Sequence, residues 1–289
     1  MSSQITDQIP DSFTLIRPVN SSTQWAKSTR QVPVIASIPH SGLHVPSEIA
    51  ESFTPQHLRS LPNSDWHLQP LYDFLPKLGV TVLQANYSRY VVDLNRALKP
   101  PLFGSFWSAV VPARTAFKQR IYQEGRLPNR ENIQARIEKY YQPYHRQLQR
   151  LLDEAVAQCG KVCLLDLHSF MGLVEEDVCL GNARGKTCSE NIINSATESF
   201  IRSGYSTVQN KVFTGGFITR HYGLQPDVEA LQIELRYPTY LPSDQIAEPV
   251  SKNGEAQLPI TIPHYSSSTF TQAQIKLESV FARILSTLA

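Results

Sequence analysis

The stretch from Lys161 to Gly172, KVCLLDLHSFMG, constrains the fold more than any other part of the sequence. Its apolar run, Val162 to Leu165, has no helical periodicity, which is typical of a strand buried on both faces. Polar residues follow at once, with Asp166, His168 and Ser169 at the expected end of that strand. Because open α/β sheets bind ligands beyond the carboxyl ends of their strands, this position is a candidate site, with a histidine that only caps the next turn as the alternative.

Similar apolar runs alternate with helical patterns along the whole chain. They predict further strands at about residues 13–16, 32–38, 80–86, 206–212 and 230–235. Apolar residues at three- and four-residue spacings predict helices within 46–60 and at about 64–78, 129–159, 188–203 and 271–288, and Pro143 is expected to kink or divide the third of them. The segments 99–128 and 215–223 are predicted to be loops, although 115–122 has some helical character.

This alternation contains no internal repeat and no linker of distinctive composition. We therefore expect a single α/β domain over residues 1–289, with an irregular arm over 1–31. Its three layers would be a central, mostly parallel or mixed sheet with helices on both faces.

The composition excludes several classes of protein. An apolar fraction of 41% with 18% charged residues is typical of a globular domain. Lys and Arg number 27 against 25 Asp and Glu, a net charge of +2 without a basic run, so nucleic acid is not an expected partner. No apolar segment is long enough for a bilayer, no signal peptide is visible, and the four cysteines form no C-x-x-C pair. A cytoplasmic protein is expected.

Four predicted strands or extended segments end in polar or charged side chains. These are His40, the pair Asn95 and Arg96, the pair Asp166 and His168, and the pair Glu234 and Arg236. Structural roles alone seldom explain so many buried charges. Two histidines and a carboxylate form the ligand set of a catalytic zinc site. His40 and His168 are therefore candidate ligands, and Asp65 is the candidate carboxylate, with a helix N-cap as its alternative role.

Other residues match further requirements of such a site. Hydrolysis by a zinc enzyme needs a base that takes a proton from water and a donor that stabilises the oxyanion. Glu234 could be the base, and an arginine or histidine could be the donor. Arginine prefers bidentate contact with carboxylates, so Arg96 or Arg236 would suit an acidic substrate. His44 and His67 lie near His40 and Asp65 in the sequence and are alternative ligands.

Seven segments, in order along residues 40–240, together resemble the N-formylglutamate amidohydrolase family. They are IPHSG (38–42), SDW (64–66), SRYVVDLNR (88–96), PYH (143–145), DLHSF (166–170), GGFITRHYG (215–223) and QIELR (232–236). That family is in turn similar to zinc carboxypeptidases, aspartoacylase-like enzymes and cell-wall amidases. The resemblance implies an α/β/α fold of the zinc-exopeptidase type and one catalytic zinc ion.

The resemblance also implies roles for individual residues. His40 and His168 match the family's metal-binding histidines, and Asp65 is the expected third ligand. Glu234 is similar to the general base of zinc carboxypeptidases, and Asn95 with Arg96 is similar to the pair that holds a terminal carboxylate in those enzymes. Additional contacts to the substrate or its oxyanion are expected from His221, Arg220, Arg236 and Ser169.

The implied reaction is hydrolysis of a small acidic N-acyl amino acid. N-formyl-L-glutamate would give formate and glutamate. The alternatives are a zinc peptidase or amidase that acts on short peptides or other N-acyl amino acids, and a metal-free binding protein on the same fold. A serine nucleophile is not expected, because the sequence has no G-x-S-x-G elbow.

Overall fold

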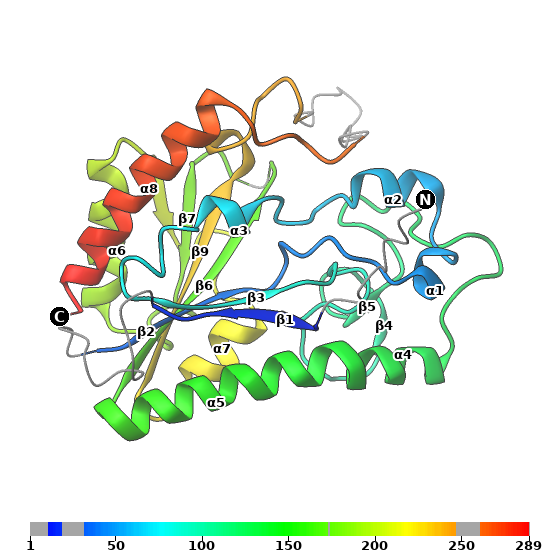
Figure 1. The fold of residues 1–289 in the computed structure, drawn as a ribbon, viewed down its shortest axis with the longest axis horizontal. Coiled ribbons are helices and arrows are strands. Elements are labelled where there is room, and N and C mark those ends of the chain that lie inside the picture. Colours follow the sequence, from blue (N-terminus) through cyan, green and yellow to red (C-terminus); the bar gives the residue numbers. More distant parts are fainter. Residues whose placement is uncertain (1–10, 19–31, 173, 247–260, 289) are drawn as a thin grey trace, which may run out of the picture.

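A mixed sheet of seven strands forms the centre of the protein (Figure 1), which a computed structural model describes over residues 11–18, 32–172, 174–246 and 261–288. The strand order is β1-β3-β2-β6-β9-β7-β8. Strands β3, β2, β6 and β9 are parallel, whereas β1 and β7 pair antiparallel with β3 and β9. The strands are β1 Phe13–Ile16, β2 Val34–Ile38, β3 Thr81–Ala85, β6 Val162–Phe170, β7 Val178–Gly181, β8 Thr207–Gln209 and β9 Val228–Arg236. The predicted α/β class with a mostly parallel sheet is confirmed.

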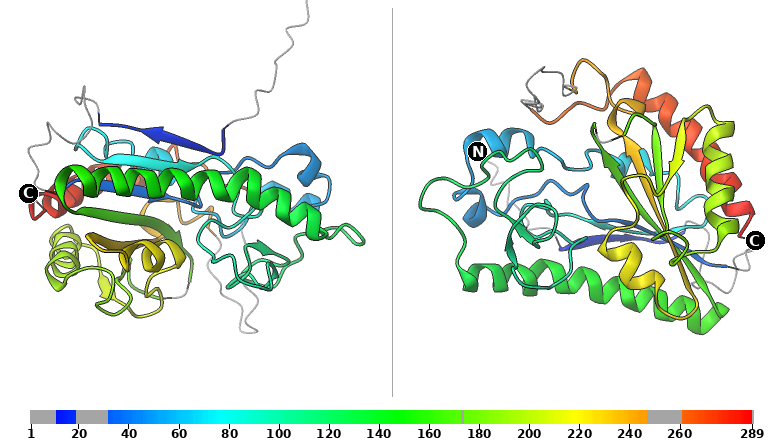
Figure 2. Two further views of the ribbon diagram at one scale, coloured as in Figure 1. Left: turned by 90° about the horizontal axis from the view of Figure 1, so that it is seen from below. Right: turned by 180° about the vertical axis from the view of Figure 1, so that it is seen from behind.

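Helices cover both faces of this sheet (Figures 1 and 2). Helices α5 (Gln142–Cys159) and α7 (Phe217–Gly223) pack on one face. On the other face lie α3 (Leu68–Leu71), α6 (Glu190–Arg202) and α8 (Ser268–Ser286). Successive residues of β6 alternate between the two apolar layers, because side chains of a strand point to opposite faces. Burial on both faces explains why the central strands have no polar alternation.

The long helical pattern stays helical from Arg130 to Cys159 and is interrupted only by a π-helical turn before Pro143. Helix α4 (Arg130–Arg136) starts with a capping box at Asn129, and a π-helical turn (Ile137–Tyr141) joins it to α5. Pro143 cannot donate to the carbonyl four residues earlier, and that carbonyl, of Lys139, instead accepts a hydrogen bond from Ser12 Oγ at 2.9 Å.

Several sequence-based boundaries are wrong. The helix predicted over 64–78 is reduced to the four residues of α3, because the left-handed backbone of His67 prevents a helix from passing through it and Pro76 cannot donate to the carbonyl oxygen of Tyr72. The N-cap of α3 is His67, so the N-cap role considered for Asp65 is excluded. Residues 217–223, predicted as a loop, form α7, and 115–122 are not helical. The region 46–60 holds two short helices, α1 (Ser47–Ala50) and α2 (Pro55–Ser60), and 99–128 holds two short strands, β4 (Phe103–Gly104) and β5 (Val111–Pro112).

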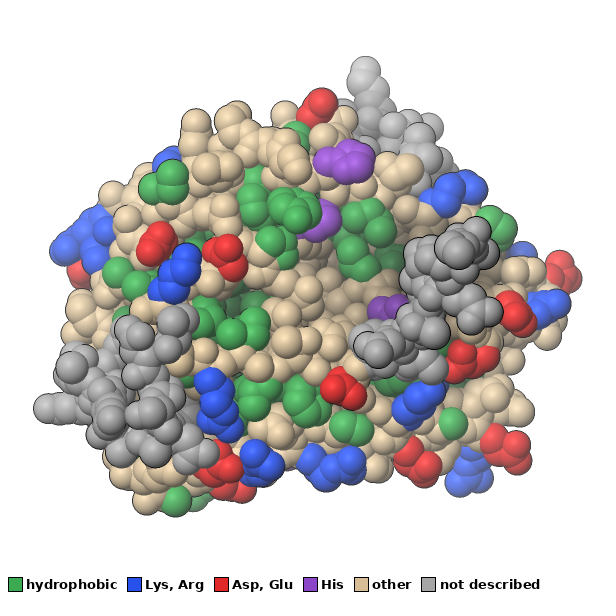
Figure 3. All heavy atoms as spheres, in the orientation of Figure 1, with side chains coloured by type: hydrophobic (Ala, Val, Ile, Leu, Met, Phe, Trp, Pro, Cys, Tyr) green, Lys and Arg blue, Asp and Glu red, His purple; other side chains and the backbone are tan. Residues whose placement is uncertain are grey.

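The charges on the surface are consistent with the nearly equal numbers of acidic and basic residues in the sequence. Side chains of both charge signs are interspersed on the face shown in Figure 3, most of them towards its periphery. Within the described ranges, no helix combines the length and the apolar character that crossing a membrane requires. The four cysteines are free thiols.

Most of the predicted arm over 1–31 lies outside the described residues, but Phe13–Ile16 adds the predicted strand to the sheet edge.

A buried histidine in α2 is expected to make folding sensitive to acid. His57 is 3% exposed, its ring nitrogens have no hydrogen-bond partner, and it packs against Phe53 and Tyr90. Burial lowers the pKa of His57 to about 3. The unfolded chain binds a proton here below about pH 6.5 and the folded chain does not, so stability is lost as pH falls through this window. At pH 5 the loss from this residue is about 2 kcal/mol.

Replacing this histidine tests that expectation. Urea unfolding of His57→Phe at pH 7.5 and pH 5.0 should show a smaller loss of unfolding free energy than wild type, by about 2 kcal/mol. The exposed His264→Gln serves as the control and should behave like wild type. An equal acid-induced loss in His57→Phe and wild type would contradict the assignment.

Candidate metal centre

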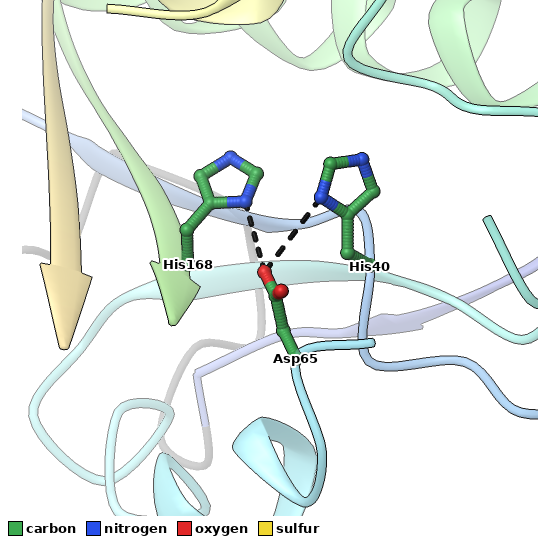
Figure 4. Close-up of side chains that lie close together, drawn as sticks. All are labelled: His40, Asp65 and His168. Carbon is green, nitrogen blue, oxygen red and sulfur yellow. Dashed lines mark hydrogen bonds and ion pairs between the residues drawn. The ribbon is translucent and has the colours of Figure 1, made fainter. Parts of the chain in front are cut away.

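The centre of the site is an acidic side chain between two imidazoles. His40 lies two residues after the end of β2, and His168 lies near the end of the neighbouring strand β6. The backbone N–H of Asp65 donates to the carbonyl of His40 at 3.1 Å, which ties the loop before α3 to the loop after β2. Asp65 Oδ2 lies 2.9 Å from His168 Nδ1 and 3.7 Å from His40 Nδ1 (Figure 4). All three side chains are buried.

The far nitrogen of His40 is held by a buried ion pair. His40 Nε2 lies 2.8 Å from Asp93 Oδ1. Two N–H groups of Arg89 donate to Asp93 Oδ2, at 2.6 and 3.2 Å. Burial alone would raise the pKa of Asp93, but Arg89 holds that pKa well below its usual value. An ionised Asp93 therefore fixes the imidazole so that Nδ1 faces Asp65.

His168 is oriented in the same way. Its Nε2 lies 3.0 Å from Asn95 Nδ2 and 3.1 Å from Asp166 Oδ1. The Asn95 amide is itself fixed, because Oδ1 accepts the backbone N–H of Ile218 at 2.7 Å. Thr219 Oγ1 donates to the other oxygen of Asp166 at 2.9 Å. With Nε2 occupied, Nδ1 of His168 is the nitrogen that faces Asp65.

The three side chains have the chemistry of a metal centre. One donor atom each from His40, Asp65 and His168 lies within 4.8 Å of the others, and no other such group of His, Cys, Asp and Glu occurs among the described residues. Burial would raise the pKa of Asp65, but hydrogen bonds with His168 and His40 lower it below the usual range, so the carboxylate is charged. Two imidazole nitrogens and a carboxylate suit Zn²⁺, with a coordination position open for a substrate or water.

The alternative ligands considered from the sequence lie elsewhere. His44 makes an edge-to-face contact with Tyr87, at 4.9 Å between ring centroids. His67 Nε2 lies 2.6 Å from the carbonyl oxygen of Pro263. Neither histidine belongs to the group formed around Asp65.

Glu234 lies beside this centre as a consequence of strand register. Parallel pairing of β6 and β9 sets Glu234 opposite His168, so both side chains point to the same face of the sheet. Gln232 Nε2 donates to Glu234 Oε1 at 2.6 Å and holds the carboxyl group. Burial raises the pKa of Glu234 to about 8. A cation bound nearby would favour its ionised form, because opposite charges stabilise each other.

The centre opens into a cavity of about 530 Å³. His40, Asp65, His168 and Glu234 line it together with Asn95, Arg96 and Ser169. The guanidinium group of Arg96 donates to the carbonyl oxygen of Phe106 through two N–H groups, at 3.0 and 3.1 Å. Ser169 Oγ accepts a hydrogen bond from Tyr240. Arg96 therefore brings a positive charge, and Ser169 a hydroxyl group, to the same space as the candidate centre.

Three residues expected to contact the substrate do not line the cavity. His221 is exposed on α7 and stacks on Phe217, at 4.9 Å between ring centroids. Arg220 is also exposed and donates to Thr214 Oγ1 and to the carbonyl oxygen of Gly215. Arg236 donates to the carbonyl oxygen of Glu175.

The sequence indicated only one support of the two histidines, Asp166, which lies two residues before His168 and 3.1 Å from its Nε2. No support for His40 was predicted, whereas the structure places Asp93 beside its Nε2. Asn95 was expected to hold substrate, yet its amide contacts His168 and α7. The available signal was the run SRYVVDLNR, which carries two arginines, an aspartate and an asparagine in an otherwise apolar segment.

Comparisons with known proteins agree with this fold and identify the family. The sequence profile of the N-formylglutamate amidohydrolase family matches residues 32–241. The N-formylglutamate deformylases of Pseudomonas putida and Pseudomonas aeruginosa are each 35% identical to this chain; the matches cover 73% of it and 82% and 83% of those proteins. The crystal structure of N-formylglutamate amidohydrolase from Ralstonia eutropha JMP134 superimposes with a TM-score of 0.74 at 24% identity, over 96% of this chain and 98% of that one, so the fold is shared. The chain belongs to the N-formylglutamate amidohydrolase family.

Proposed function

We propose that this chain is a zinc-dependent amidohydrolase that cleaves the amide bond of N-acyl amino acids. The relatives from Pseudomonas are named for N-formylglutamate, so N-formyl-L-glutamate, cleaved to formate and glutamate, is the first substrate to test. The observation that carries the proposal is the convergence of His40, Asp65 and His168 beside Glu234 in one cavity.

His40, Asp65 and His168 would hold the zinc ion, which when bound would polarise the amide carbonyl and make water more acidic. Glu234 would take a proton from the attacking water at its carboxylate and pass it to the leaving nitrogen. Gln232 holds that carboxylate through the 2.6 Å hydrogen bond. Arg96 would bind the substrate carboxylate and position the amide at the centre.

The proposal is tested by loading the purified chain with zinc and measuring formate release from N-formyl-L-glutamate. About one zinc ion per chain and zinc-dependent release are expected, since the centre offers three protein ligands. Full activity after zinc is removed by a chelator would refute the metal dependence. No release of any acyl group from a panel of N-acyl amino acids would refute the hydrolase.

Removing the guanidinium group of Arg96 should chiefly weaken substrate binding. A charge-assisted hydrogen-bonded contact contributes about 1.5–3 kcal/mol, so kcat/KM of Arg96→Ala should fall about 10- to 150-fold, mostly through KM. The control is Arg220→Gln, on an exposed arginine outside the cavity, and its effect should be far smaller. Equal effects of the two substitutions in steady-state kinetics would count against Arg96 as the carboxylate contact.

A further inference from the structure

The cavity wall next to Arg96 is aromatic. The ring centroid of Phe106 lies 4.5 Å from the guanidinium carbon of Arg89 and 5.9 Å from that of Arg96. Trp107 packs edge-on to Phe106, with ring centroids 5.1 Å apart, and remains 56% exposed. Both residues line the cavity. A group attached to a carboxylate at Arg96 would therefore meet aromatic rings.

Other chain segments extend this apolar surface. Phe117, Val212 and Phe213 line the same cavity, and Phe213 packs on Phe170 with ring centroids 4.9 Å apart. Val212 is 45% exposed although it is a large apolar residue. Exposed apolar side chains that line a cavity indicate an apolar ligand group.

The charges of the cavity suit one carboxylate rather than two. Arg89 and Arg96 are the cationic side chains among the described residues that line it. Arg89 is buried and uses its N–H groups on Asp93 and on the carbonyl oxygen of Asn63. Arg96 reaches Asp93 only at 4.0 Å and otherwise contacts carbonyl oxygens. A second carboxylate would be buried against apolar rings without a charged partner, which is unfavourable.

The cavity also has room for a large side chain. N-formylglutamate has about 12 non-hydrogen atoms, which would fill about 360 Å³ even at the ~30 Å³ that each water molecule occupies in the liquid. The cavity of about 530 Å³ exceeds that volume.

We propose that Phe106, Trp107, Phe117, Val212 and Phe213 form an apolar subsite for the substrate side chain. The preferred substrates are then N-formyl amino acids with a single carboxylate, bound at Arg96, and an aromatic or long aliphatic side chain. This inference rests on the proposed hydrolase function and refines its substrate class. The preferred substrate of this chain would then differ from N-formylglutamate, the substrate for which its 35% identical relatives are named.

The first test compares substrates on the zinc-loaded full chain. Formate release from N-formyl-L-phenylalanine and N-formyl-L-leucine should have a kcat/KM at least about tenfold above that of N-formyl-L-glutamate, equivalent to about 1.4 kcal/mol. Equal values or a preference for N-formyl-L-glutamate would overturn the subsite and leave the hydrolase function standing.

Binding separates the two proposals if no substrate is turned over. Calorimetry with the zinc-loaded chain should show tighter binding of L-phenylalanine than of L-glutamate. That result without hydrolysis would support the subsite while refuting the hydrolase. Tighter or equal binding of L-glutamate would overturn the subsite whatever the kinetics show.

A new charge on the subsite provides the matched variant. Val212→Arg should shift the kcat/KM ratio towards N-formyl-L-glutamate over N-formyl-L-phenylalanine by at least about tenfold, because it adds a cation to the apolar surface. Val212→Gln adds a polar side chain without charge and should shift the ratio much less. Equal ratios in the two variants would place Val212 outside the subsite and overturn the assignment.

Discussion

Glu234→Gln is expected to lower kcat by about 10²- to 10⁴-fold, which is the usual contribution of a general base. The amide keeps the shape of the carboxyl group, and its oxygen can still accept the hydrogen bond from Gln232, so folding should be unaffected. It cannot take a proton from water at neutral pH. Zinc content should remain about one ion per chain, measured by elemental analysis beside single-turnover kinetics.

The same strand offers a control for this substitution. Glu229 also belongs to β9, but it does not line the cavity, and its carboxylate accepts the backbone N–H of Ser189 at 2.8 Å. Glu229→Gln should therefore keep nearly full activity. Retention of most of the activity in Glu234→Gln would show that Glu234 is not the base, without contradicting the proposed metal centre.

The second large effect is expected from the proposed metal ligands. Asp65→Asn and His168→Gln should bind little zinc and lose nearly all hydrolysis, because each removes one of the three proposed ligands. Zinc that binds only the folded chain should also raise the melting temperature of the wild type, and a chelator should abolish that increase. In the two variants the melting temperature should not respond to zinc or chelator.

His44→Gln and His67→Gln are the matched controls, since both histidines are near the ligands in sequence and outside the candidate centre. Both variants should bind zinc and respond to chelator as the wild type does. Normal zinc content in Asp65→Asn and His168→Gln, or its loss in either control, would show that the ion binds elsewhere.

Much of the sheet follows from local sequence. Strands β2, β3, β6 and β9 were predicted because each is an apolar run buried on both faces. The same logic placed His40, His168 and Glu234 near strand ends, since the polar residues begin where each run stops. Strand β7, the helical state of 217–223 and the shortness of α3 were missed, because turns, prolines and tertiary packing override local pattern in short elements.

The sequence by itself determined which residue types were available for catalysis and that buried parallel strands would carry them. Only the tertiary structure decided which of these side chains lie close together. Parallel register sets Glu234 beside His168, and the close approach of Gly216 to the Asn95 side chain, where a Cβ atom would come within 2.3 Å, fixes the amide that holds this imidazole. The structure also showed that Asn95 contacts His168, and it brought Phe106 and Val212 to one cavity. These contacts join segments that are far apart in the chain, so the distances between them cannot be predicted from the local sequence.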